Sequence, residues 1–270
     1  MSSGLLLVGC GKMGGALLQG WLDRGTPSSS VTIIEPVIAA AATATAAGVR
    51  VCAEAGALPR DYRPEVILLA VKPQVMDAAV APLKPLAAPG TLVLSIAAGK
   101  TIAGFEKSLG PGAAIVRAMP NTPAAVGRGI TVCCPNRQVT PAMRGRCDEL
   151  LKAVGEVAWI EDEALMDPVT AVSGSGPAYV FLLIEAMAAA GAKAGLPPDL
   201  AMQLARATVC GAGELAFRAA EPAATLRQNV TSPGGTTQAA LEVLMAPGGL
   251  QPVMDQAVAA ATRRSRELAS

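Results

Sequence analysis

The chain has 270 residues, which is enough for one large domain or two modest ones. Hydrophobic residues make up 51% and aromatic residues only 3%, so Ala, Val, Leu and Ile must fill the core. A net charge of +1 leaves no basic stripe for nucleic acid, and the absence of histidine excludes histidine metal sites and histidine acid–base catalysis. We therefore expect no nucleic-acid partner and no metal.

Up to about residue 160, short β-rich runs alternate with helix-like stretches. The runs VILLAV and TLVLSI are continuously apolar, as is typical of strands buried on both faces of a sheet. This alternation predicts a doubly wound parallel sheet. The expected strands are residues 5–8, 31–35, 66–71, 91–96, 114–117, 130–133 and 157–159.

After about Ile160 every apolar pattern becomes helical. The expected helices are residues 179–191, 197–220, 236–245 and 253–268. The sequence therefore predicts an α/β fold with two domains. A Rossmann-type domain would cover residues 1–161 and an all-helical domain would cover residues 162–270.

Two apolar segments bear on localisation. Residues 5–8 are too short for a signal peptide, and no Lys or Arg precedes them. Residues 172–192 are interrupted by Pro177 and contain Glu185, which favours a buried helix over a membrane span. We expect a cytoplasmic protein with no membrane partner, whose six cysteines stay reduced.

The sequence GCGKMG at residues 9–14 lies between the first strand and the first helix. Gly9 permits a tight turn, Gly11 lets the backbone approach a pyrophosphate, and Gly14 lets helix and strand pack closely. Glu35 ends the second strand about 20 residues later, where a carboxylate accepts hydrogen bonds from an adenosine ribose. A solvent-facing strand end is the alternative for Glu35.

Three more loops follow predicted strands, and ligands of such sheets lie at the carboxyl ends of the strands. The alternatives are a solvated lysine in the first of these loops and a plain Asn-Pro turn in the last. The candidate ligand-binding residues in these loops are Val71, Lys72, Pro73, Ser95, Ala97 and Asn121.

The segment SPGGTT at residues 232–237 is the most distinctive feature of the second half. Gly234 and Gly235 immediately before a predicted helix favour a nest of backbone N–H groups, which is a natural carboxylate site. Thr237 places a hydroxyl beside it.

Together, SIAAG, RAMPNTP, VSGSGPAYVF and SPGGTT resemble the pyrroline-5-carboxylate reductase family. The resemblance runs from residue 5 to about residue 268, in the family's order. It implies that the helical domain dimerises, giving a homodimer or a larger homo-oligomer built from dimers, with an active site where two subunits meet. The implied reaction is reduction of L-1-pyrroline-5-carboxylate to L-proline, the last step of proline biosynthesis, usually with NADPH.

The resemblance also implies roles for individual residues. Thr237 would be the catalytic residue, through a hydrogen bond to the ring nitrogen of the substrate. The implied substrate-binding residues are Ser232, Gly234, Gly235, Thr237 and Asn121. The implied cofactor-binding residues are Gly9, Gly11, Lys12, Met13, Gly14, Glu35, Val71, Lys72, Pro73, Ser95 and Ala97. Where the family often has Ser, Thr or Arg for the 2′-phosphate, this chain has Glu35-Pro36-Val37, so the expected cofactor is NADPH or NADH.

Two other functions remain open from the sequence. A 3-hydroxyacid dehydrogenase of the two-domain type would carry a catalytic lysine on the long helix, but residues 178–190 contain none, and Lys193 lies beyond them. A non-catalytic dinucleotide-binding regulator would keep the glycine loop without needing SPGGTT. A protonated cyclic imine accepts hydride without a protein acid, which suits a chain that lacks histidine.

Overall fold

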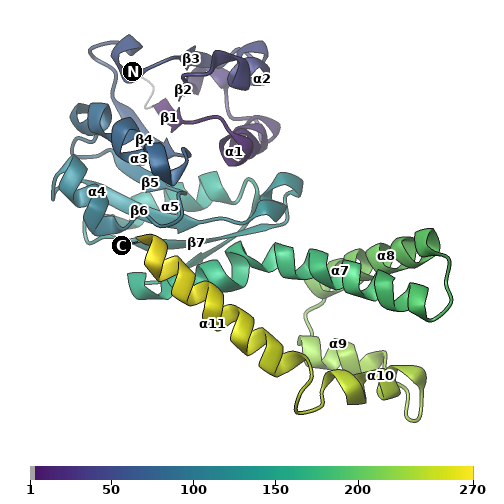
Figure 1. The fold of residues 1–270 in the computed structure, drawn as a ribbon. Coiled ribbons are helices and arrows are strands. Elements are labelled where there is room, and N and C mark those ends of the chain that lie inside the picture. Colours follow the sequence, from purple (N-terminus) through teal and green to yellow (C-terminus); the bar gives the residue numbers. More distant parts are fainter. Residues whose placement is uncertain (1–3, 270) are drawn as a thin grey trace. The chain divides into compact units, whose positions relative to one another are not determined.

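The computed structural model describes residues 4–269. By its internal contacts the chain forms two compact units (Figure 1). The first unit comprises Met1–Gly174 together with Thr262–Ser270, and the second comprises Ser175–Ala261.

The first unit is built on one sheet with the strand order β3-β2-β1-β4-β5-β6-β7-β8. The strands are β1 (Gly4–Val8), β2 (Val31–Ile34), β3 (Arg50–Cys52), β4 (Pro64–Leu69), β5 (Leu92–Ser95), β6 (Ala114–Met119), β7 (Gly129–Pro135) and β8 (Gly155–Trp159). Strands β1 to β6 pair in parallel, β7 pairs antiparallel with β6, and β8 is parallel to β7. The predicted Rossmann-type sheet is confirmed, with two differences.

The differences lie at the edges of the sheet. Strand β3 escaped prediction because it has three residues and begins with the exposed Arg50. Strand β7 runs antiparallel to β6 because a short connection, which contains the turn Thr122–Val126 (η6), joins the two strands. A parallel pairing would require a crossover of a dozen or more residues.

Helices cover both faces of this sheet. Helices α1 (Lys12–Asp23), α2 (Ala42–Ala46) and α5 (Pro141–Leu151) pack on one face, and α3 (Met76–Val80) and α4 (Ile102–Leu109) pack on the other. Trp21 of α1 is 2% exposed, and its indole N–H donates to the Leu150 carbonyl at 2.8 Å. Because its one polar group is satisfied, this ring can fill the core without an unpaired donor.

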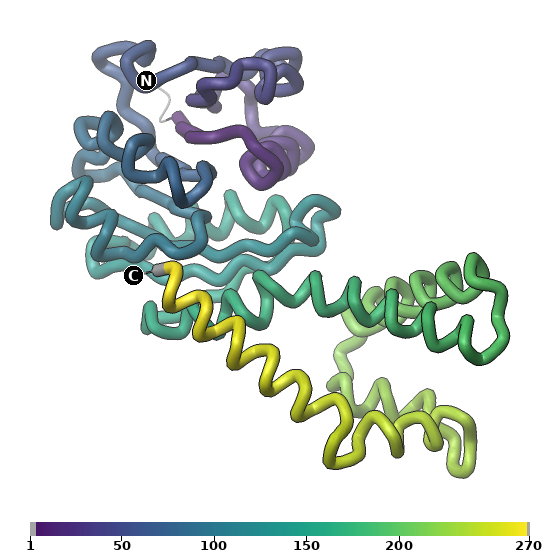
Figure 2. The backbone as a smooth tube through the Cα atoms, viewed as in Figure 1, coloured from purple at the N-terminus to yellow at the C-terminus, as the bar shows by residue number. Residues whose placement is uncertain are grey.

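The second unit is helical, and no strand follows Trp159 in residues 4–269. Its helices are α7 (Gly176–Lys193), α8 (Pro198–Arg218), α9 (Ala223–Asn229), α10 (Thr236–Leu244) and the first part of α11 (Leu250–Ala269). Helices α7 and α8 run side by side (Figure 2) and approach through small residues. A Cβ atom at Gly191 would lie 3.3 Å from the Ala201 Cβ.

The long helix α7 is not buried within the chain, so that expectation was wrong. Phe181 is 59% exposed and Leu182 is 63% exposed, and the buried residues described for the second unit are Ala188, Ala201 and Ala205. The run Glu163–Lys193 has the length and composition that could cross a membrane, and 6% of its most apolar window is buried. Small side chains let α7 approach α8 closely, while Phe181 and Leu182 of α7 stay largely exposed.

The segment between the sheet and α7 packs with the first unit. It contains the turn Glu163–Leu165 (η7), helix α6 (Met166–Val169) and the π-helical turn Thr170–Gly174 (η8). Met166 and Ala171 in this segment are fully buried. The compact units therefore divide after Gly174, whereas the domain boundary expected after residue 161, where the strands end, stays a prediction.

Candidate functional site

The glycine loop joins β1 to α1 at the carboxyl edge of the sheet. Gly9 has φ +93°, and a Cβ there would lie 2.8 Å from Val71 Cγ1. A Cβ at Gly14 would clash with the Gly9 carbonyl oxygen, whereas a Cβ at Gly11 would meet nothing within 4 Å. The packing of the chain thus explains Gly9 and Gly14, whereas the space beside Gly11 is open.

The first turn of α1 offers backbone donors to a ligand. Gly11 is the N-cap residue and supplies no side-chain cap, so the first N–H groups of the helix keep their capacity for a phosphate. Lys12 is exposed, while the side chain of Met13 packs against the core. The contact of Met13 with a ligand in this loop stays a prediction.

Glu35 lies against the glycine loop. One carboxylate oxygen accepts from the Cys10 N–H at 2.9 Å, and the other accepts from the Val37 N–H at 3.0 Å. These bonds hold the carboxylate beside the loop, and the contact of Glu35 with a ribose stays a prediction. Burial, and secondly the charge of Glu35, raise the pKa of the Cys10 thiol, which therefore stays protonated at neutral pH.

The loops after β4 and β5 extend the same edge. Val71 reaches the glycine loop, Pro73 is half-buried, and Lys72 is exposed at the start of the turn Pro73–Val75 (η4). The fully buried Ser95 hydroxyl accepts from the Ala97 N–H at 3.4 Å. Ser95 therefore shapes its loop.

Asn121 belongs to the loop between β6 and β7. Its side-chain oxygen accepts from the Ile130 N–H at 2.9 Å, which ties the loop to the start of β7. The oxygen of the carboxamide therefore supports the loop. Asn121 lies in the first unit, and its contact with a ligand stays a prediction.

The SPGGTT segment forms a turn before α10 in the second unit. The Gly235 N–H donates to the Ser232 carbonyl at 3.0 Å, and Gly234 has φ +70°. Gly235 is the N-cap residue without a side-chain cap, and the half-buried Thr237 lies in the first helical turn. The predicted juxtaposition of two glycines, a hydroxyl and a helix start is present.

Sequence reasoning missed one residue of this turn. The Gln238 side chain accepts from the Gly234 N–H at 2.7 Å, so, with the bond from Gly235 to Ser232, both glycine donors of the expected nest already have partners. Its position, third in the helix, is the one from which a Gln side chain can reach back to the backbone, but Gly235 lacks the Ser or Thr side chain of a full capping box. The ligand-facing donors of this turn are therefore those of the first turn of α10.

Comparisons with known families and proteins agree along the chain. The family described as pyrroline-5-carboxylate reductase dimerisation matches residues 163–268, and the family described as NADP oxidoreductase coenzyme F420-dependent matches residues 4–99. Pyrroline-5-carboxylate reductase of Pseudomonas aeruginosa is 41% identical over 98% of this chain and 96% of its own length. The Synechocystis enzyme of the same name is 48% identical over 76% of this chain and 75% of its own length.

Solved structures show the same likeness. The pyrroline-5-carboxylate reductase of Coxiella burnetii is 34% identical, with a TM-score of 0.93 over 100% of both chains. The Plasmodium falciparum pyrroline carboxylate reductase, solved with NADP bound, is 30% identical, with a TM-score of 0.81 over 99% of this chain and 98% of its own.

Proposed function

Because the chain belongs to the pyrroline-5-carboxylate reductase family and is an NAD(P)H-dependent enzyme of proline biosynthesis, we propose roles for the residues of its two candidate sites. The observation that carries the assignment is the 41% identity over almost the whole of both chains. Neither the hydroxyacid dehydrogenase nor the regulator accounts for that full-length match.

The dinucleotide binds at the carboxyl edge of the sheet. Its pyrophosphate lies against residues 9–14 and the first turn of α1, where uncapped N–H groups and the helix dipole favour an anion. Glu35 accepts from the ribose, and the loops bearing Lys72 and Ala97 form the remaining wall. Bound NAD(P)H supplies the hydride.

The substrate carboxylate binds at the turn before α10. The first N–H groups of that helix recognise the anion, and Gly234 and Gly235 let it approach the turn without side chains in the way. Thr237 orients the ring by a hydrogen bond to the imine nitrogen. Hydride adds to the carbon of the protonated C=N bond, whose π electrons become the nitrogen lone pair, so the step needs positioning more than acid catalysis.

The second unit completes its core in a homodimer or in a larger assembly of dimers. The family that matches residues 163–268 is described as pyrroline-5-carboxylate reductase dimerisation, and helix α7 exposes Val180, Phe181, Leu182 and Leu183. Apolar surface of this kind is typical of an obligate interface. This account needs no membrane for α7, and we place the enzyme in the cytoplasm.

Gly11→Ala tests the cofactor site. Gly11 has φ −70° and ψ −164°, and a Cβ there meets no atom within 4 Å, so the variant should fold as the wild type does. It should nevertheless lose about tenfold or more in cofactor affinity, because the methyl group occupies the path of the pyrophosphate. NAD(P)H oxidation with pyrroline-5-carboxylate, compared with 3-hydroxyacid oxidation, is the assay. Unchanged affinity in a folded variant would remove the loop from the cofactor site.

A further inference from the structure

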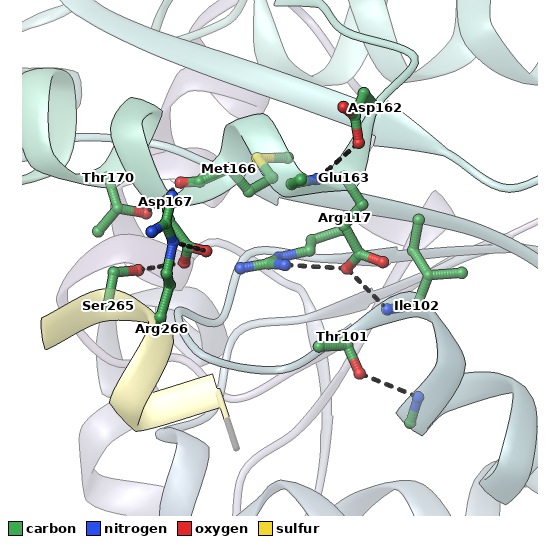
Figure 3. Close-up of polar contacts among 12 residues, drawn as sticks. Thr101, Ile102, Arg117, Asp162, Glu163, Met166, Asp167, Thr170, Ser265 and Arg266 are labelled. Atoms are coloured by element: carbon green, nitrogen blue, oxygen red, sulfur yellow. Dashed lines mark hydrogen bonds and ion pairs between the residues drawn. The ribbon is translucent and has the colours of Figure 1, made fainter. Parts of the chain in front are cut away.

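The loop that follows β5, residues 96–101, is fixed at its far end by Glu163 (Figure 3). One oxygen of Glu163 accepts from the Ile102 N–H, where α4 begins, and from the Arg117 guanidinium, each at 2.9 Å. The Arg117 side chain is 6% exposed, so this ion pair is shielded from water. The start of α4 is thereby tied to strand β6.

The middle of the same loop rests on the last turn of α11. Gly99 has φ +72°, and a Cβ there would lie 3.1 Å from the carbonyl oxygen of Leu268. The two backbones therefore approach without side chains between them. The shape of the loop at Gly99 depends on where this end of α11 lies.

A hydrogen bond ties that end of α11 to helix α6. The Ser265 hydroxyl donates to the Asp167 carboxylate at 2.7 Å, and Ser265 is 7% exposed (Figure 3). Arg266 lies 3.7 Å from the other oxygen of Asp167, but its side chain is 65% exposed, so water weakens that pair. The bond from Ser265 is the stronger constraint.

We propose that the Asp167–Ser265 hydrogen bond positions the loop after β5 for dinucleotide binding. Asp167 is a positioning residue, since it acts through the last turns of α11 and the backbone at Gly99. A loop that is already ordered loses less conformational freedom when it binds its ligand. The inference rests on the proposed cofactor site, to which this loop contributes Ala97.

Ser265→Ala in the full-length enzyme tests the proposal by fluorescence titration with NADPH. The Kd should rise about 5- to 50-fold, while kcat at saturating cofactor and the KM for pyrroline-5-carboxylate stay close to wild type. Asp167→Ala should raise the Kd for NADPH by a similar factor. Asp167→Asn, which keeps an oxygen for the Ser265 hydroxyl, should restore nearly wild-type affinity.

Thr91→Val is the matched control. Thr91 is 5% exposed, and its hydroxyl donates to the Pro64 carbonyl at 2.8 Å at the opposite end of β5. Thr91→Val removes a buried bond of the same kind, so it should lower thermal stability similarly but leave the Kd within about twofold.

Two results would be decisive against the inference. If folded Ser265→Ala changes the Kd no more than Thr91→Val does, the bond is merely structural and the proposal is overturned. If Asp167→Asn binds NADPH as weakly as Asp167→Ala, the hydrogen bond is not the cause. Equal NADPH affinity of the wild type and Gly11→Ala would instead overturn the cofactor site itself, independently of Ser265.

Discussion

Replacing Glu35 by Ser should move cofactor preference toward NADPH. The two hydrogen bonds to the Cys10 and Val37 N–H groups hold the Glu35 carboxylate at the glycine loop, so it cannot swing away from an arriving 2′-phosphate. A carboxylate accepts from the ribose hydroxyl of NAD but repels the phosphate of NADP. We therefore expect the wild type to use NADH at least as well as NADPH.

The size of the effect follows from the partial burial of the carboxylate. Two like unit charges about 4 Å apart repel by about 1 kcal/mol in bulk water and by about 4 kcal/mol near a protein surface. Converted to affinity, this range is roughly 5- to 1000-fold. Glu35→Ser removes the repulsion and also frees the Cys10 and Val37 N–H groups, which can then donate to phosphate oxygens.

Side-by-side kinetics with both cofactors provide the measurement. The quantity to compare is the ratio of kcat/KM for NADPH to kcat/KM for NADH, because any general damage to the glycine loop cancels in that ratio. Glu35→Ser should raise the ratio at least about fivefold. A wild-type preference for NADPH above about tenfold, or a ratio that Glu35→Ser leaves unchanged, would refute the reasoning.

Three further predictions concern chemistry, assembly and pH. Thr237→Ala should fold normally and lose roughly 10- to 1000-fold in kcat/KM, the range of one well-placed hydrogen bond, and steady-state kinetics beside circular dichroism check it. Analytical ultracentrifugation should find a dimer or a multiple of one. The variant Phe181→Glu, on the exposed face of α7, should shift the protein toward monomer and lose activity. An active monomer would contradict the shared interface. Burial raises the pKa of Cys134 to about 11 and that of Cys147 to about 12. Since the folded state disfavours their thiolates, the contribution of these two thiols to the free energy of unfolding should be constant below about pH 8 and fall as the pH rises through the unfolded thiol pKa toward 11, as denaturant titrations above about pH 8 can show.

Local sequence features predicted the structure best. The glycine loop and the SPGGTT turn depend on backbone freedom within a few residues, so Gly9, Gly14 and Gly234 could be placed before any contact was known. The chain's long-range contacts could not be placed that way. The Asp167–Ser265 bond joins residues 98 positions apart, and neither side chain belongs to a motif.

Burial of α7 was mispredicted for a different reason. Its apolar composition indicates that the helix must be covered, but composition does not indicate by what. The residues that contact α8, such as Ala188, are small, and the large ones point elsewhere. The sequence of one chain does not distinguish apolar surface that the chain itself covers from apolar surface that a second copy covers.

The return of α11 to the first unit has a consequence for how the chain is made. Residues Thr262–Ser270 belong to the same compact unit as Met1–Gly174, although the whole second unit is translated between them. The sheet and its covering helices can assemble during synthesis, but the Ser265 hydroxyl reaches Asp167 only after the helical unit has been translated. Completion of the first unit therefore waits for translation of the helical unit, and the loop at Gly99 can gain its contact with α11 only after that unit has been made.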